Sequence, residues 1–141
     1  MPVRSSTAEW KGSIREGSGH MVVGKGAYDG PFSFVSRFED GSGTNPEELI
    51  AAAHAGCFSM ALSGALSRAG TPPTSISTTA KVHIDKVEAG FESTTIELET
   101  VGVVPGIDEK AFVEAAEGAK AGCPVSKALK AVNITLKASL K

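Results

Sequence analysis

The chain has 141 residues, of which 41% are hydrophobic, and this is enough for a single compact domain over residues 1–141. Its formal charge of −2 and its 21% of charged residues, with both signs interspersed, provide no basic stripe, so we expect no nucleic-acid partner and no anionic lipid partner. Residues 1–10 lack the apolar core of a secretory signal, and serines interrupt the longest apolar run, so we expect a cytoplasmic protein that does not cross a membrane.

The opening third of the chain predicts short antiparallel strands. Glycines punctuate it, and polar residues alternate with β-prone residues in segments 8–11 and 20–23. Segment 32–38 alternates more cleanly and predicts a further strand, with its phenylalanines and Ser36 on one face. Arg37 would then lie on the other face, away from the phenylalanines.

The best-marked element is a helix that begins at Pro46. Asn45 is a favourable N-cap, and two glutamates place negative charge in the first turn, where Glu48 can close a capping box with Asn45. Gly70 and two prolines end the helix. Residues 49–66 are small or apolar almost all the way round, so we expect burial on most sides. A second copy of the chain would help to cover such a helix, which indicates a symmetric dimer.

The rest of the chain completes an α+β order. The pattern predicts a β-hairpin of residues 75–87 with 91–104, followed by a capped helix over 108–120. A short helix over 124–129 and a final strand over 132–136 complete the chain. We therefore predict an α+β fold in which antiparallel sheets surround a long, buried central helix.

Two cysteines, Cys57 and Cys123, are too few for a disulfide framework in a domain of this size. Cys57 lies within the apolar helix, where burial raises a thiol's pKa and leaves it inert without a nearby charge. Cys123 precedes a proline at a helix start, where free amide groups and the helix dipole favour a thiolate. Local context leaves a structural and a reactive role open for both. The histidines show no metal-ligand spacing, and we expect His54 to be an interior, packed or hydrogen-bonded residue.

An activated thiolate needs a cation nearby. Arg37 is a candidate because a guanidinium stays charged even when it is desolvated. Glu47 is a candidate carboxylate to hold Arg37, and Glu39 and Asp40 are equally available, although such residues more often form a solvated turn. Ten helical positions separate Glu47 from Cys57, which is roughly 15 Å, so in a shared site they would come from different subunits.

Four segments with specific motifs follow one another along the chain: RFE at 37–39, GTNPEELI at 43–50, AAHAGCFSMALS at 52–63 and AKAGCPVS at 119–126. Together they resemble the OsmC/Ohr family, and specifically its osmotically inducible protein C branch. The likeness covers nearly the whole chain. It implies an intertwined α+β homodimer with active sites at the subunit interface, and thiol-dependent reduction of organic and inorganic peroxides.

The resemblance also implies the role of each site residue. Cys57 would be the peroxidatic nucleophile and Cys123 the resolving thiol. Arg37 would be the activating cation, and Glu47 the carboxylate that orients it. We expect the Cys57 thiolate to attack the O–O bond and Cys123 to convert the resulting sulfenic acid into a disulfide. Arg15 is the alternative cation, because the arginine of the Ohr branch lies in a more N-terminal segment. Gly56 stands where alanine is common in the family, and a helical glycine costs about 0.5–1 kcal/mol relative to alanine.

The expected partners follow from the same reasoning. An apolar wall from Phe58, Met60 and the phenylalanine segment predicts faster turnover of organic hydroperoxides than of hydrogen peroxide, in oxidative or osmotic stress defence. The family suggests a lipoyl-type dithiol as reductant, and nothing in the sequence indicates a flavin, a haem or a metal. Two other classes stay open: a redox sensor whose disulfide does not turn over, and a structural stress-response dimer with two buried thiols.

Overall fold

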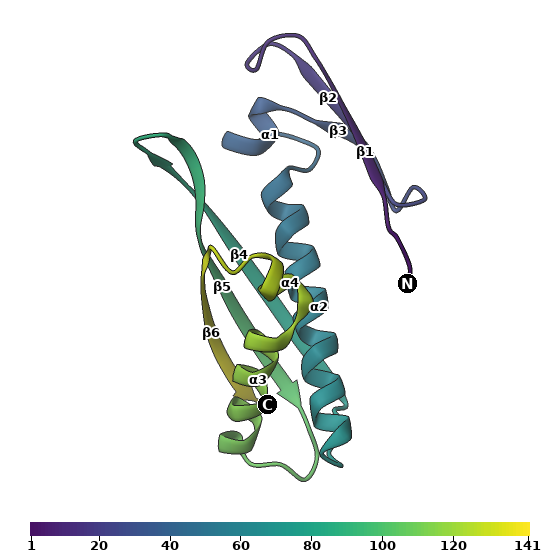
Figure 1. The fold of residues 1–141 in the computed structure, drawn as a ribbon, viewed down its shortest axis with the longest axis vertical. Helices are drawn as coiled ribbons and strands as arrows, with labels where there is room; N and C mark the ends of the chain where they lie inside the picture. Colours follow the sequence, from purple (N-terminus) through teal and green to yellow (C-terminus); the bar gives the residue numbers. More distant parts are fainter. The chain divides into compact units, whose positions relative to one another are not determined.

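The computed structural model describes residues 1–141 and has an α+β architecture, as predicted (Figure 1). In chain order the elements are β1 Ser6–Lys11, β2 Ser18–Val23, β3 Tyr28–Phe32, α1 Phe34–Phe38, α2 Pro46–Arg68, β4 Ser75–Val87, β5 Gly90–Val103, α3 Glu109–Gly122, α4 Pro124–Ala128 and β6 Asn133–Leu140. The chain divides into two compact units, residues 1–49 and residues 50–141.

The first unit contains an antiparallel sheet in the order β1-β2-β3. Trp10 on β1 and Phe32 on β3 both pair with Gly19 of β2, and their ring centroids lie 5.5 Å apart. Gly19 is needed there because a Cβ atom would lie 2.5 Å from the Phe32 ring. Met21 is the only buried hydrophobic residue of this unit. A sheet with so small a core needs a further surface to cover it.

The prediction of a strand over residues 32–38 is wrong, because β3 ends at Phe32 and helix α1 follows. The Ser33 hydroxyl accepts a hydrogen bond from the Ser36 backbone N–H at 3.0 Å, and the Ser36 hydroxyl accepts one from the Ser33 backbone N–H at 2.8 Å. This reciprocal capping box stabilises a helix start in spite of the alternating sequence. Arg37 consequently does not lie away from the phenylalanines: its guanidinium carbon is 5.2 Å from the Phe38 ring centroid.

Helix α2 begins at Pro46, as predicted. The Glu48 backbone N–H donates to the side-chain oxygen of Asn45 at 2.9 Å, so Asn45 caps the helix. The predicted return bond is not formed, because the Glu48 carboxylate accepts from the Thr44 hydroxyl instead, at 2.9 Å. The Asn45 amide nitrogen donates to the Ser36 carbonyl oxygen at 2.8 Å and so connects the start of α2 to α1.

The sheet of the second unit has the order β4-β5-β6. Strands β4 and β5 form the predicted hairpin, and Gly90 at its turn has a φ of +130°, which favours glycine. Strand β6 pairs with β5 in parallel, so this sheet is mixed rather than antiparallel as predicted. Helices α3 and α4 form the crossover that a parallel pair requires. Asp108 caps α3 as predicted, accepting from the Ala111 backbone N–H at 2.8 Å.

The core of the second unit combines one face of this sheet with α2 and α3 (Figure 1). Ile96 and Leu98 of β5 and Phe112 of α3 are fully buried in it. Helix α2 contributes a stripe of fully buried or nearly fully buried residues spaced four apart: His54, Phe58, Leu62 and Leu66. This spacing places them on one face of the helix.

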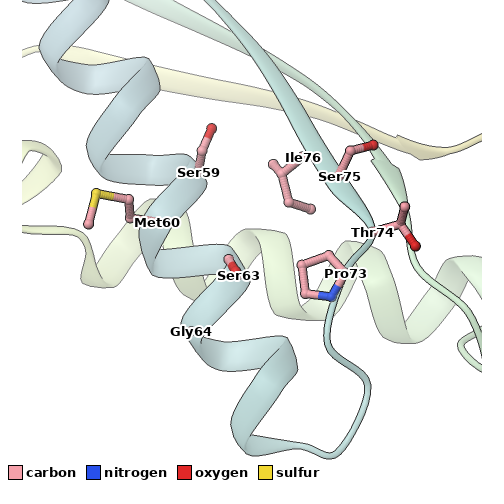
Figure 2. Close-up of a pocket in the computed structure, with 8 residues that line it drawn as sticks. All are labelled: Ser59, Met60, Ser63, Gly64, Pro73, Thr74, Ser75 and Ile76. Carbon is pink, nitrogen blue, oxygen red and sulfur yellow. The ribbon is translucent and has the colours of Figure 1, made fainter.

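Apart from Glu47, the other residues of α2 are half-buried or exposed, so the helix of a single chain is less buried than predicted. Met60 is 78% exposed, and an open hollow of about 500 Å³ lies between this part of α2 and residues 73–76 (Figure 2). We expected the serines of α2 to interrupt its apolar run. Its mean hydropathy nevertheless stays high, so by length and composition α2 could cross a membrane. This is weak evidence for a span, since core helices of soluble proteins meet the same criterion.

Candidate active site

Arg37 and Glu47, both in the first unit, form a bidentate ion pair. The Nε atom of Arg37 donates to one carboxylate oxygen of Glu47 at 3.1 Å, and Nη2 donates to the other at 2.8 Å. The Glu47 side chain is 11% exposed and the Arg37 side chain 38% exposed. A bidentate pair of this kind fixes the plane of the guanidinium group. The structure therefore brings these two predicted site residues together and leaves the cation partly accessible.

The alternative residues occupy other positions in the first unit. The guanidinium carbon of Arg15 lies 4.7 Å from the Phe34 ring centroid, which is a cation–π contact rather than a carboxylate pair. Glu39 ends α1, where its backbone N–H donates to the Val35 carbonyl oxygen at 3.0 Å. Glu39 and Asp40 are both exposed. Of the two candidate cations, only Arg37 is held by a carboxylate.

Cys57 lies within α2, in the second unit, and its thiol is free and half-buried. Burial raises the pKa of the Cys57 thiol, a hydrogen bond from the Val125 backbone lowers it, and the neighbouring Cys123 raises it again. Because the net shift is upward, the protonated thiol predominates at neutral pH. A cation is needed to make this sulfur reactive.

Cys123 ends α3 and caps α4. Its sulfur is fully buried and accepts a hydrogen bond from the Ser126 backbone N–H at 3.3 Å, the contact with amide groups expected from its place before Pro124. The Cys123 thiol in turn donates to the Ser126 hydroxyl at 3.2 Å. Cys57 and Cys123, far apart in the sequence, are thus neighbours at the junction of α2 with α4.

Two further polar residues, His54 and Ser126, lie beside the Cys123 thiol. Neither was among the predicted site residues. His54 is completely buried, and its Nε2 atom lies 2.7 Å from the Ser126 hydroxyl oxygen. Burial lowers the pKa of His54, so the imidazole is neutral at pH 7. The sequence signal for Ser126 is its place three residues after a helix-capping cysteine, whereas no local pattern could pair it with His54.

The candidate site residues thus form two groups: the Arg37–Glu47 ion pair within residues 1–49 and the neighbouring free thiols of Cys57 and Cys123 within residues 50–141. No group of three or more His, Cys, Asp or Glu side chains is arranged to hold a metal ion. An α+β fold with a partly exposed thiol beside a buried one defines a thiol redox protein as the class.

Comparisons with known proteins identify the family. The family model described as OsmC-like protein matches residues 39–137. Over 139 residues the chain is 52% identical to peroxiredoxin OsmC of Escherichia coli (strain K12), covering 98% of this chain and 96% of the relative. It is 33% identical over 98 residues to an organic hydroperoxide resistance protein of Xanthomonas axonopodis pv. citri (strain 306), covering 68% of this chain and 67% of the relative. The chain belongs to the OsmC-like protein family, and the resemblance inferred from its motifs is confirmed.

Solved structures agree with this assignment. The organic hydroperoxide resistance protein OhrB of Bacillus subtilis superimposes with a TM-score of 0.73 at 27% identity, covering 97% of this chain and 98% of that chain. An organic hydroperoxide resistance protein of Elizabethkingia anophelis gives a TM-score of 0.73 at 26% identity, covering 99% of this chain and 97% of that chain. The predicted OsmC/Ohr fold is therefore confirmed.

Proposed function

We propose that this chain is a thiol-dependent peroxidase that reduces organic hydroperoxides to alcohols. The observation that carries the proposal is the pair of free, neighbouring thiols, Cys57 and Cys123, in a chain that shares 52% identity with a relative named a peroxiredoxin. A reactive sulfur beside a second thiol can be oxidised and then returned to a reducible disulfide.

The reaction needs only the two thiols and an external dithiol. The Cys57 thiolate attacks the terminal oxygen of ROOH, the O–O bond breaks, and the alkoxide RO⁻ takes up a proton from water and leaves as ROH. Cys57 is then a sulfenic acid. Cys123 attacks that sulfur, an S–S bond replaces the S–O bond, and the released hydroxide becomes water with the proton from Cys123. A dithiol reduces the Cys57–Cys123 disulfide by exchange, and no cofactor takes part.

Arg37 supplies the charge that Cys57 lacks. Burial keeps the Cys57 thiol protonated at neutral pH, and a nearby guanidinium favours the thiolate. Nε and Nη2 of Arg37 are engaged with Glu47, which leaves the Nη1 donors for the peroxide oxygens, where negative charge develops as the O–O bond breaks. Glu47 has the role of holding that guanidinium in one orientation.

The active form in this proposal is an intertwined homodimer in which each chain, residues 1–141, forms one OsmC-like domain. Arg37 and Glu47 of one subunit then meet Cys57 and Cys123 of the other, in keeping with the helical spacing between Glu47 and Cys57. Two features support a second copy: the uncovered apolar surface of α2, and a first unit that buries only one hydrophobic side chain.

The same proposal includes the substrate, the reductant and the compartment. Apolar residues around Cys57, with Phe58 in the adjacent core, favour alkyl and aryl hydroperoxides over hydrogen peroxide. A lipoyl-type dithiol is the proposed reductant, and the cytoplasm, without a membrane or a nucleic acid as partner, is the proposed site of action in stress defence.

The deciding experiment follows the consumption of cumene hydroperoxide by the purified protein with excess dihydrolipoamide. Wild type should turn over many times, Cys57→Ser should be inactive, and Cys123→Ser should stall after the first oxidation. Peroxide loss limited to one equivalent in wild type would favour the redox sensor. Thiols that resist both peroxide and alkylation would favour the structural dimer, because inert buried cysteines react slowly.

A further inference from the structure

His54 is an unusual residue to find in the core of the second unit. It occupies the first position of the buried α2 stripe whose next member is Phe58, and it has no exposed surface. Its Nδ1 atom has no hydrogen-bond partner, although it is buried. A buried polar atom without a partner destabilises the fold. An apolar side chain would avoid this cost, so packing alone does not explain the histidine.

The other nitrogen of His54 connects to the resolving thiol. His54 Nε2 lies 2.7 Å from the Ser126 hydroxyl oxygen, and the Cys123 thiol donates to that same oxygen at 3.2 Å. The Ser126 backbone N–H adds a donor to the Cys123 sulfur at 3.3 Å. The contacts form a continuous path from the His54 imidazole through the Ser126 hydroxyl to the Cys123 sulfur, which is a neighbour of Cys57.

The proton arrangement on this path suits removal of the thiol proton. In the tautomer with hydrogen on Nδ1, Nε2 is a free acceptor for the Ser126 hydroxyl, which accepts in turn from the Cys123 thiol. Burial keeps the imidazole neutral, so the acceptor is vacant at pH 7.

We propose that His54, acting through Ser126, is a positioning residue that takes up the proton of Cys123 when Cys123 attacks oxidised Cys57. This inference rests on the proposed peroxidase function and concerns its second step. The thiol proton passes to the Ser126 oxygen while the hydroxyl proton passes to His54 Nε2. The Cys123 sulfur bonds to the Cys57 sulfur, the S–O bond breaks, and the hydroxide leaves. That hydroxide becomes water with the proton returned through Ser126, so His54 ends neutral.

Charged groups lie near one member of this path, Ser126. Ser126 also lines an open hollow of about 510 Å³ together with Lys120, Lys127 and Lys130. Cys57, the group of α2 that neighbours Cys123, is uncharged as a sulfenic acid in this step.

The test separates the two oxidation steps in a single turnover. Reduced full-length protein is mixed with one equivalent of cumene hydroperoxide without reductant, and peroxide loss and thiol loss are followed together. In His54→Gln and Ser126→Ala, peroxide loss should match wild type, whereas disulfide formation should slow by about 100-fold or more and dimedone should trap a sulfenic acid on Cys57. Ser126→Thr, which restores the hydroxyl, should recover most of the rate.

A pH series distinguishes proton transfer from a structural effect. The defect in Ser126→Ala should shrink as pH rises, because hydroxide can then take the Cys123 proton directly. Ser59→Ala is the matched control: it removes a hydroxyl from α2 that bonds to Thr78 at 2.8 Å and should leave both steps unchanged.

Disulfide formation at the wild-type rate in folded His54→Gln or Ser126→Ala would overturn the proposal, as would a defect of equal size at every pH. If His54→Gln does not fold, the comparison of Ser126→Ala with Ser126→Thr decides alone. Failure of wild type to consume peroxide would instead refute the proposed function, so the two failures are distinguishable.

Discussion

Substitution of Glu47 by glutamine tests whether the ion pair with Arg37 orients the guanidinium for catalysis. Glutamine keeps one oxygen that can accept from Arg37 Nη2, but it places an NH₂ group against Nε and removes the charge. One of the two short bonds, at 3.1 Å and 2.8 Å, is therefore lost and the other weakened. A charge-assisted bond of this kind contributes about 1.5–3 kcal/mol. Because Arg37 is partly exposed, we expect about 1–2 kcal/mol in the barrier to Cys57 oxidation, a roughly 5- to 30-fold lower rate.

The assay measures kcat/KM for cumene hydroperoxide together with the rate of Cys57 alkylation by iodoacetamide in Cys123→Ser protein. Both rates should fall in Glu47→Gln. Glu48→Gln is the matched control, because it removes the adjacent first-turn charge of α2 but only a bond to Thr44. Each substitution should cost a similar 0.3–1 kcal/mol or so of helix-dipole stabilisation. Wild-type kinetics in Glu47→Gln, or an equal loss in Glu48→Gln, would refute the role given to this pair.

Three further predictions concern stability and assembly. Asn45→Ala removes the cap of α2 and the bond to the Ser36 carbonyl, and should lower the free energy of unfolding in urea by about 1–3 kcal/mol; an unchanged midpoint would contradict the cap. His54 has a pKa below the usual 6.5, so the unfolded chain binds more protons there, and the melting temperature should fall as pH drops from about 6.5 to 5. This slope should flatten in His54→Gln, and an identical slope would contradict it. Met60→Lys should turn the proposed dimer into monomers in analytical ultracentrifugation without unfolding the chain, whereas a stable dimer would place the interface elsewhere.

Elements with local signals could be predicted well from the sequence. The start of α2 depends on Asn45 and Pro46, which act within one turn, and the β4–β5 hairpin depends on alternation around Gly90. Both were predicted because the interactions that stabilise them join residues close in sequence. The parallel pairing of β6 was not predicted, since it depends on how the crossover α3–α4 returns the chain to the sheet.

For segment 32–38, the local sequence pattern gave the wrong secondary structure. Its alternation fits a strand, and the competing signal, two serines that cap each other, lacks the glutamate or glutamine of the usual capping box. The helix that forms instead orients Arg37 toward Glu47 and over Phe38. The sequence suggested the right residues for this pair, and only the structure established their contact.

The sequence by itself determined the α+β order, the capped apolar helix, the family and the identity of the candidate thiols, because these depend on composition, period and motif. The tertiary structure decided which groups surround each sulfur. Cys57 and Cys123 are neighbours, and His54 contacts Ser126, only because α4 packs against α2. In the chain, β4, β5 and α3 separate these two helices. Such contacts depend on chain closure over many residues and on the packing of a shared core, and no local pattern encodes either.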